Sequence, residues 1–164
     1  MKRLKILSQV FLIAALAGCA TSDHSQVVVS QAVGPDLARP RIDLGQGKGR
    51  LVVYTAREVN DPVSYFPTPS SYSIYTDDGR LLQRVDNRAG SLYQDPSLVS
   101  LPAGRYKVKG RATNDGEVLV PVVIEENKTT LVDLEGVTFP QHKPTGAGQW
   151  IRLPNGQVIG QRYE

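Results

Sequence analysis

The sequence predicts an all-β fold, a single antiparallel β-sandwich of about seven strands followed by a C-terminal β-hairpin. Between residues 50 and 137, short runs of β-branched and aromatic residues alternate with clusters of Gly, Pro, Asp and Asn, which is typical of strands joined by turns. Beyond the N-terminal stretch, no longer segment shows helical periodicity. The chain has 164 residues, of which 40% are apolar, and this is enough for one domain with a modest core.

The first three predicted strands cover residues 51–59, 72–76 and 80–86. The first is rich in β-branched and aromatic residues. The second alternates between apolar and polar positions, as expected for a strand with one buried face. Asp77-Asp78-Gly79 is a turn sequence, so the second and third strands are expected to form a hairpin.

The fourth and fifth predicted strands cover residues 98–101 and 105–113, with Pro102-Ala103-Gly104 as a tight turn between them. The fifth strand alternates strictly. One face carries Tyr106, Val108, Gly110 and Ala112, and the other face carries Arg105, Lys107, Lys109 and Arg111. We therefore expect the first set in the core and the second set on the exposed face.

The last two strands are predicted at residues 117–125 and 129–134, the former after the turn Asn114-Asp115-Gly116. Pro121 lies inside the former strand and has no N–H to donate to a neighbouring strand. This strand is therefore expected at the edge of a sheet or with a bulge.

The tail, residues 138–164, begins as a loop and then predicts a small hairpin from residues 149–153 and 157–162. Its turn contains Asn155-Gly156, a pair that favours a type I′ turn. Because a lone hairpin is marginally stable in water, we expect this one to dock on the sandwich or on a partner.

Residues 1–18 are predicted to be a signal peptide. Lys2, Arg3 and Lys5 form a basic region, and an apolar stretch follows from Ile6 to Leu16. This stretch is too short for a membrane-spanning helix and is followed by small residues, as in a cleaved signal.

The next residues, Leu16-Ala17-Gly18-Cys19, resemble the lipobox of bacterial lipoproteins. The resemblance implies cleavage before Cys19 and acylation of its thiol and its new amine, so that acyl chains such as palmitate anchor the chain to a membrane. Ala20 follows in place of Asp, which implies export to the outer membrane with the domain facing the periplasm. A Gram-positive source would place it on the cell surface.

Residues 19–49 are polar and contain several Gly and Pro, so they predict a lipidated tether with a reach of about 30 Å. Residues 27–29 could add a short strand within it.

The first eighteen residues carry three of the 19 cations and none of the 16 acids. The formal charge of +3 for the whole chain therefore falls to zero from Cys19 onward. The basic isoelectric point is thus no sign of nucleic-acid binding.

The hairpin of residues 73–84 and the segment Leu101–Val108 resemble prealbumin-like or carboxypeptidase-regulatory-like domains of bacterial envelope proteins. The likeness covers about half of the chain. It implies an Ig-like or prealbumin-like sandwich, residues 50–137, in a class of domains that mostly bind, brace or orient other molecules.

Catalytic and metal-binding patterns are not evident in the sequence. His24 and His142 lie in the predicted tether and tail loop, and the only thiol is assigned to the lipid, which disfavours a hydrolytic Ser–His pair and a zinc site. Asp77-Asp78 would suit calcium but is explained as part of a turn. Glu125 and Glu126 point to opposite faces of a strand and so cannot act as a catalytic pair. We expect no metal and no cofactor.

A basic stripe is formed by Arg105, Lys107, Lys109 and Arg111, to which Arg80 and Arg84 add charge. In one interpretation it is a solvated face whose cations pair with Glu117, Asp133 or Glu135. In the other it contacts an anionic envelope polymer or an acidic protein, which predicts salt-sensitive binding.

A second candidate surface is the segment of residues 62–69, which carries Tyr65 and Phe66 among prolines. Tyr72 follows it, and Trp150 lies in the tail. Aromatic faces suit sugars or Pro-rich chains, and the prolines place the segment at an edge or in an exposed connection. Alternatively, Tyr65 and Phe66 fold back onto the sandwich.

These patterns favour a lipid-anchored, non-enzymatic envelope protein that presents its sandwich as a docking or structural module to a protein partner. One alternative is a glycan-binding lipoprotein that uses the aromatic segment. Another is a small cell-wall or lipid hydrolase without a recognisable motif. A cleft with converging acids would support the hydrolase, and an exposed apolar patch would support docking.

Overall fold

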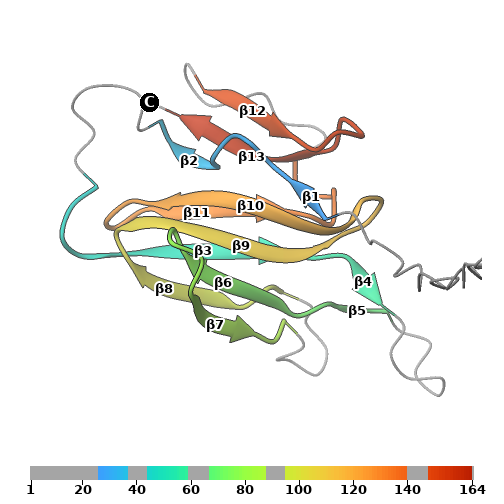
Figure 1. Ribbon diagram of the computed structural model, residues 1–164, viewed down its shortest axis with the longest axis horizontal. Helices are drawn as coiled ribbons and strands as arrows, with labels where there is room; N and C mark the ends of the chain where they lie inside the picture. Colours follow the sequence, from blue (N-terminus) through green and yellow to red (C-terminus); the bar gives the residue numbers. More distant parts are fainter. Residues whose placement is uncertain (1–25, 37–43, 59–66, 88–94, 140–147, 164) are drawn as a thin grey trace, which may run out of the picture.

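The computed structural model describes residues 26–36, 44–58, 67–87, 95–139 and 148–163. All regular structure in these ranges is β-strand, and the strands form four sheets (Figure 1). The prediction of an all-β fold is therefore confirmed. These ranges contain no α-helix, and hence none that is long and apolar enough to cross a membrane.

The largest sheet has five strands in the order β1-β10-β9-β6-β7. Their bounds are Val27–Val28 (β1), Gly116–Ile124 (β10), Gly104–Ala112 (β9), Tyr72–Thr76 (β6) and Leu81–Val85 (β7). The predicted hairpins across residues 77–79 and 114–116 are confirmed as the antiparallel pairs β6–β7 and β9–β10. A bulge in the first pair lies between Ile74 and Tyr75.

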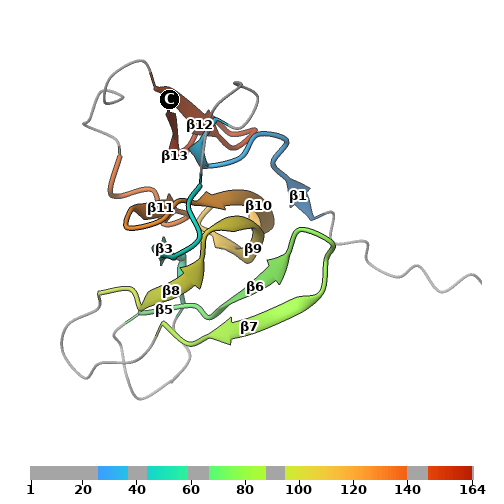
Figure 2. The ribbon, with the colours of Figure 1, turned by 90° about the vertical axis from the view of Figure 1, so that its left-hand side faces the viewer.

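A second sheet has three strands in the order β11-β3-β8. Their bounds are Thr129–Asp133 (β11), Lys48–Tyr54 (β3) and Leu98–Pro102 (β8). This sheet shares one hydrophobic core with the five-stranded sheet, and Figure 2 shows both sheets turned by 90° from the view of Figure 1. The core is built mainly from Val, Leu and Ile, among them the fully buried Leu51, Ile74 and Val108.

All seven strands predicted between residues 50 and 137 are present, but the prediction of one antiparallel sandwich needs correction. β11 pairs with β3 in parallel, and β1 pairs with β10 in parallel. Segment Pro102-Ala103-Gly104 joins strands of different sheets instead of neighbouring ones. The hydrophobic pattern identifies strands and their buried faces, whereas the choice of partner depends on contacts distant in sequence.

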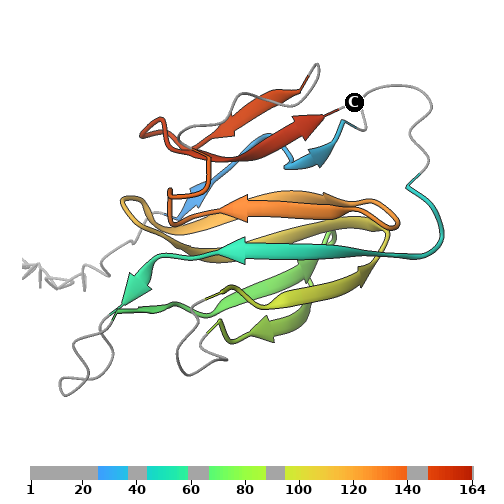
Figure 3. The same ribbon diagram turned by 180° about the vertical axis from the view of Figure 1, so that it is seen from behind.

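A third sheet lies beside β10 and β11, as Figure 3 shows from behind. It consists of β12 (Gln149–Arg152), β13 (Val158–Tyr163) and β2 (Gly34–Pro35). The predicted tail hairpin is confirmed as the antiparallel pair β12–β13. Ile151, Leu153 and Ile159 belong to the common core, so the hairpin docks on the chain's own sheets.

The type I′ turn predicted at Asn155-Gly156 is wrong. Such a turn needs positive φ at both central residues, but of these two only Gly156 has positive φ (89°). The amide of Gly156 donates to the carbonyl of Leu153, and the Asn155 side chain accepts from the amide of Gln157. Pro154 and Asn155 thus occupy the centre of the turn, where the fixed φ of proline is favourable.

Part of the segment predicted as a tether, residues 19–49, is built into the sheets. β1 and β2 are paired strands, residues 44–47 lead into β3, and residues 48 and 49 are the first two of β3. Gly34 has φ of 118°, and a Cβ there would lie 2.5 Å from the carbonyl oxygen of Val123. A glycine is therefore required where β2 packs closely on β10.

Pro121 lies neither on an edge strand nor at a bulge of β10. On one side β10 pairs with β9 in continuous register, and on the other side it pairs with β1 and then with Val33. The amide of Val29 donates to Leu119 and the amide of Val33 to Pro121. Residues 30–32 bend away between these contacts, beside the position where Pro121 lacks an N–H. The irregularity thus falls in the neighbouring segment.

The strand predicted over residues 51–59 is interrupted at Thr55. The amide of Ala56 donates to Arg111 of β9, so the chain leaves one sheet for the other at this point. Beyond it, β4 (Arg57–Glu58) pairs with β5 (Thr68–Pro69) as a small separate sheet. This short pair forms one wall of the site described next.

Candidate functional site

The outward face of the five-stranded sheet carries the predicted basic stripe. The β-pairing registers place Lys109 beside Leu119 of β10 and Ser73 of β6, and Ser73 beside Arg84 of β7. Glu117 lies beside Arg111 in the next row of the same face. Strands are about 4.8 Å apart, so these charges lie within reach of one ligand.

A groove of about 550 Å³ opens on this face. It is lined by Glu58, Ser70, Ser71, Tyr72, Ser73, Tyr75, Arg84, Lys109, Gly110, Arg111 and Glu117. β9 contributes Lys109, Gly110 and Arg111, and the neighbouring strands β6, β7 and β10 contribute to the lining as well. Glu58 of β4 and the two serines that follow β5 complete it. We call this feature the charged groove.

Two ion pairs cross the charged groove. Nζ of Lys109 lies 2.9 Å from Oε2 of Glu117, and Nη1 of Arg111 lies 2.8 Å from Oε1 of Glu58. All four side chains are partly exposed, so each pair contributes at most about 1 kcal/mol to stability. Arg84 is exposed and has no ion-pair partner among the described residues.

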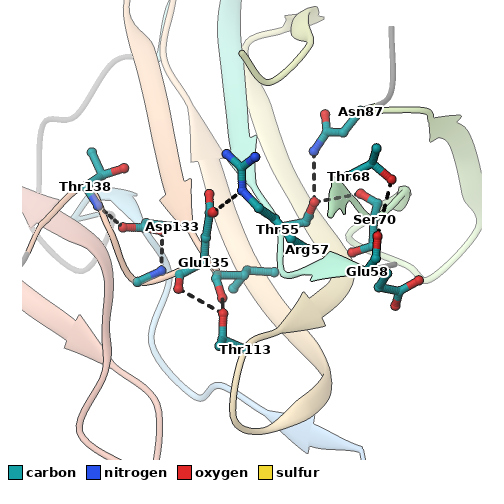
Figure 4. A network of polar contacts seen from close by, with 12 residues as sticks. Thr55, Arg57, Glu58, Thr68, Ser70, Asn87, Thr113, Asp133, Glu135 and Thr138 are labelled. Carbon is teal, nitrogen blue, oxygen red and sulfur yellow. Dashed lines mark hydrogen bonds and ion pairs between the residues drawn. The ribbon is translucent and has the colours of Figure 1, made fainter. Parts of the chain in front are cut away.

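Glu58 is held in place by a network of polar contacts, which Figure 4 shows from close by. The preceding residue, Arg57, forms an ion pair with Glu135. The backbone carbonyl oxygen of Glu58 accepts a hydrogen bond from the Thr68 hydroxyl at 3.5 Å. These contacts fix β4 against β5 and against the segment that follows β11. The carboxylate of Glu58 is thereby kept next to Arg111.

The inner part of the same network is buried. The Thr55 hydroxyl donates to the carbonyl oxygen of Ser70 at 2.6 Å, and the Asn87 amide nitrogen lies 2.9 Å from the carbonyl oxygen of Val53 and 3.1 Å from the Thr55 hydroxyl. The hydroxyl of Ser70 is buried and has no hydrogen-bond partner in the described part of the chain. A buried polar cluster therefore lies behind this wall of the charged groove.

The structure separates the members of the predicted basic stripe. Lys109 and Arg111 lie in the charged groove, while Arg105 lines a different cavity near Asp36 and Arg162. Nζ of Lys107 donates to the carbonyl oxygen of Asp77 at 2.7 Å. All four belong to one face of β9, but only two of them meet in one site.

Of the counterions predicted for the stripe, Glu117 alone faces it. Asp133 is fully buried and accepts hydrogen bonds from the amides of Gly136 and Thr138, at 2.7 and 2.6 Å. Glu135 pairs with Arg57 instead. Glu58, which pairs with Arg111, is the functional candidate that sequence reasoning missed. No local pattern indicates it, because it reaches the groove only through the break at Thr55.

The predicted aromatic surface is not assembled as expected. Tyr72 is 2% exposed and belongs to the core, so it offers no exposed aromatic face. Trp150 is half-buried on β12, where its ring lies 5.2 Å from that of Phe139, and it does not line the charged groove. Tyr65, Phe66 and Cys19 lie outside the described residues, as do the two histidines.

Other predicted chemistry has simple structural roles in the described ranges. Asp78 accepts from the Thr76 hydroxyl, and this hydrogen bond lowers the pKa of its carboxyl group. Glu125 pairs with Lys128 at 2.8 Å, whereas Glu126 accepts from the amide of Gln46 at 3.1 Å, so the two acids have separate partners. No cluster of three or more possible metal ligands occurs among the residues that the structure describes.

The charged groove brings together charged and hydroxyl side chains. It is lined by three cations and two carboxylates, which gives a local charge of +1, together with serine hydroxyls and Tyr75. These groups can hold an anion and donate several hydrogen bonds around it. No His or Cys lines it among the described residues. Comparison with protein families, curated proteins and solved structures finds no match to the chain.

Proposed function

We propose that the chain is a lipid-anchored, non-enzymatic protein of the bacterial envelope that binds an anionic envelope component in the charged groove. The groove itself carries this proposal, because it combines Arg84, which has no ion-pair partner in the described part of the chain, with two ion pairs that a ligand can join. The lipobox at Leu16–Cys19 supports the anchor, and Ala20 supports the outer membrane with the domain in the periplasm.

We further propose that the five-stranded sheet and the sheet β11-β3-β8 form a sandwich of the Ig-like or prealbumin-like kind. Their common core and the seven strands between residues 50 and 137 support this assignment. The third sheet would be an addition to that framework, made from the N-terminal segment and the tail. In domains of this kind, binding sites lie on exposed faces and loops, as the charged groove does.

The partners of the acids in the charged groove favour a binding protein over a hydrolase. Both carboxylates of the charged groove are engaged by cations, Glu58 by Arg111 and Glu117 by Lys109. Each carboxylate is thus held by a cation of the chain itself, whereas a general acid or base has to face its substrate.

A protein partner is a second candidate, and the edges of the sheets favour it. β7 is the outermost strand of the five-stranded sheet, and its Leu81 and Leu82 are 56% and 45% exposed. Leu98 on the edge strand β8 is 61% exposed. Exposed apolar side chains on edge strands suit the addition of a partner's strand.

The glycan alternative retains Trp150, while Tyr72 no longer contributes to it.

Site-specific crosslinking in cells tests the proposed function. A photoreactive amino acid replaces Ser73 in the charged groove or, as the control, Ser100 on the outward face of the other sheet. We expect a discrete adduct from position 73 of the lipidated protein and none from position 100. Equal labelling at both positions, or labelling at neither, would contradict the proposal.

A further inference from the structure

The start of the described chain lies at the rim of the charged groove. β1 pairs with β10 in parallel, with Val27 beside Val118 and Val28 beside Leu119. The register continues from Leu119 to Lys109 in the groove. Val28 is therefore two strand spacings, about 10 Å, from Lys109 on the same face.

The direction of β1 determines where the preceding residues leave the sheet. Because β1 and β10 are parallel, the chain before Val27 departs from the end at which β10 begins, next to Glu117. Arg111 lies beside Glu117 in the same end row. The groove and the exit of the N-terminal segment thus share one end of the five-stranded sheet.

The length of the segment up to Cys19 limits how far this end can lie from a membrane. Six residues lie between Cys19 and Gln26, the first described residue, so seven Cα–Cα steps join the two. A chain of that length spans at most about 25 Å in any conformation. With acyl chains on Cys19, as in the proposed function, the end row of the groove is held close to the bilayer surface.

We infer that the charged groove binds the phosphate headgroup of an anionic phospholipid in the membrane that holds the anchor. This inference rests on the proposed function and names its ligand. Arg84 and the two partly exposed ion pairs supply donors for a phosphate group, and planar guanidinium groups suit its oxygens. Val28, which is 63% exposed on the same face, supplies an apolar contact at the bilayer surface.

The position of the groove favours a lipid over a soluble polymer or a protein. A polymer in the periplasm would be reached equally well from any face of the sheets, whereas a lipid headgroup is reached only from the end next to the anchor. The chain from Cys19 has no formal net charge, so its attraction to an anionic bilayer depends on which face is turned toward it.

Vesicle binding tests the inference with a matched pair of charge variants. The chain from residue 19, with Cys19→Ser to remove the anchor, is titrated with vesicles of phosphatidylcholine alone or with about one third phosphatidylglycerol. Arg84→Glu alters the groove, and Arg50→Glu alters an exposed cation on β3 by the same charge. Thermal melting of each variant checks that the fold is retained.

We expect binding to the anionic vesicles only, lowered about tenfold by Arg84→Glu and less than about twofold by Arg50→Glu. Equal losses in the two variants would mean general charge attraction and overturn the inference. Displacement by soluble glycerol phosphate at the same phosphate concentration would overturn the bilayer as the source. Absence of vesicle binding, with a protein or polysaccharide adduct at position 73 in cells, would overturn the inference and leave the proposed function standing.

Discussion

Two buried tyrosines on the five-stranded sheet differ in what their hydroxyls contact. The hydroxyl of Tyr72 has no partner among the described residues, whereas that of Tyr106 donates to the carbonyl oxygen of Pro102 at 2.9 Å. Burial raises the pKa of both groups. Leaving a buried hydroxyl unpaired costs free energy, and satisfying it recovers part of that cost.

Tyr72→Phe is therefore expected to raise the free energy of unfolding by about 1 kcal/mol, because it removes an unpaired polar atom from the core. Tyr106→Phe is expected to lower it by about the same amount, because a hydrogen bond is lost. Urea denaturation at neutral pH measures both variants. A loss of stability in Tyr72→Phe would mean that its hydroxyl has an unrecognised partner.

The raised pKa of Tyr72 also predicts a pH dependence. The folded protein keeps this phenol neutral, while an unfolded chain ionises it above its ordinary pKa of about 10. The stabilising contribution is thus complete below that pH and is lost as the pH rises above it. Between pH 9 and 11, Tyr72→Phe should lose about 1 kcal/mol less stability than the original chain, as measured by denaturation at each pH.

Asn87 connects three separate segments. Its side chain donates to Val53 and Thr55 and accepts from the amide of Ser97, and it is 3% exposed. Asn87→Ala should lower the free energy of unfolding by about 2 to 3 kcal/mol, since several buried groups lose their partner. Gln83→Ala, at an exposed amide on β7, should change it by less than about 0.5 kcal/mol. Similar losses in both would contradict the assigned role of Asn87.

For single residues, the sequence predicts which side chains are buried better than it predicts which ion pairs the charged side chains form. The alternation along residues 105–112 correctly separates the buried face of β9 from the charged face. It also indicates Glu117 as a counterion, because a hairpin register follows from its turn. The pairing of Arg111 with Glu58 depends on a change of sheet at Thr55, which no periodicity records.

Whole strands were predictable where a turn sequence links neighbours. β6–β7, β9–β10 and β12–β13 are hairpins with such turns. β1, β2, β4 and β5 have only two residues each and are held by pairing with distant segments. The possible short strand at residues 27–29 matches β1, and β4 lies within the first predicted strand, but so short a segment carries too little pattern to indicate its partner.

The tail hairpin offers a test of docking at the level of one element. Ile159 is fully buried in the common core, while its neighbour Val158 is only half-buried on the other face of β13. Ile159→Ala should cost about 2 to 4 kcal/mol in the free energy of unfolding, and Val158→Ala should cost clearly less. Chemical denaturation compares the two. Equally small effects would mean that the hairpin does not contribute to the core.

In the molecule as a whole, the third sheet covers one side of the other sheets, and the edge strands β7 and β8 lie elsewhere. The third sheet packs beside β10 and β11, whereas β7 and β8 remain as edges in the described ranges. The sequence predicted neither this third sheet nor the parallel addition of β1, because both depend on where the chain's ends return to the core. β1 lies next to the charged groove because the N-terminal segment comes back to the core and pairs with β10.

Because the chain from Cys19 has no formal net charge, the binding to an anionic surface that we propose requires a local cluster of charge. Such binding is screened by salt. We therefore expect binding to anionic vesicles to fall at least about tenfold when the ionic strength rises from about 20 to 300 mM. Co-sedimentation at increasing salt measures this. Binding that persists unchanged would point to apolar contacts at β7 and β8 instead.

The central claim is that the outward face of the five-stranded sheet is the binding face. A map of backbone amide NMR shifts tests it most directly, with the chain from residue 19 titrated with bicelles that contain phosphatidylglycerol. We predict that the shifts gather at residues 71–75, 84, 109–111 and 117, which belong to the charged groove or lie next to it. Shifts gathered on β3 and β8, on the tail hairpin, or spread evenly over the molecule would contradict the claim.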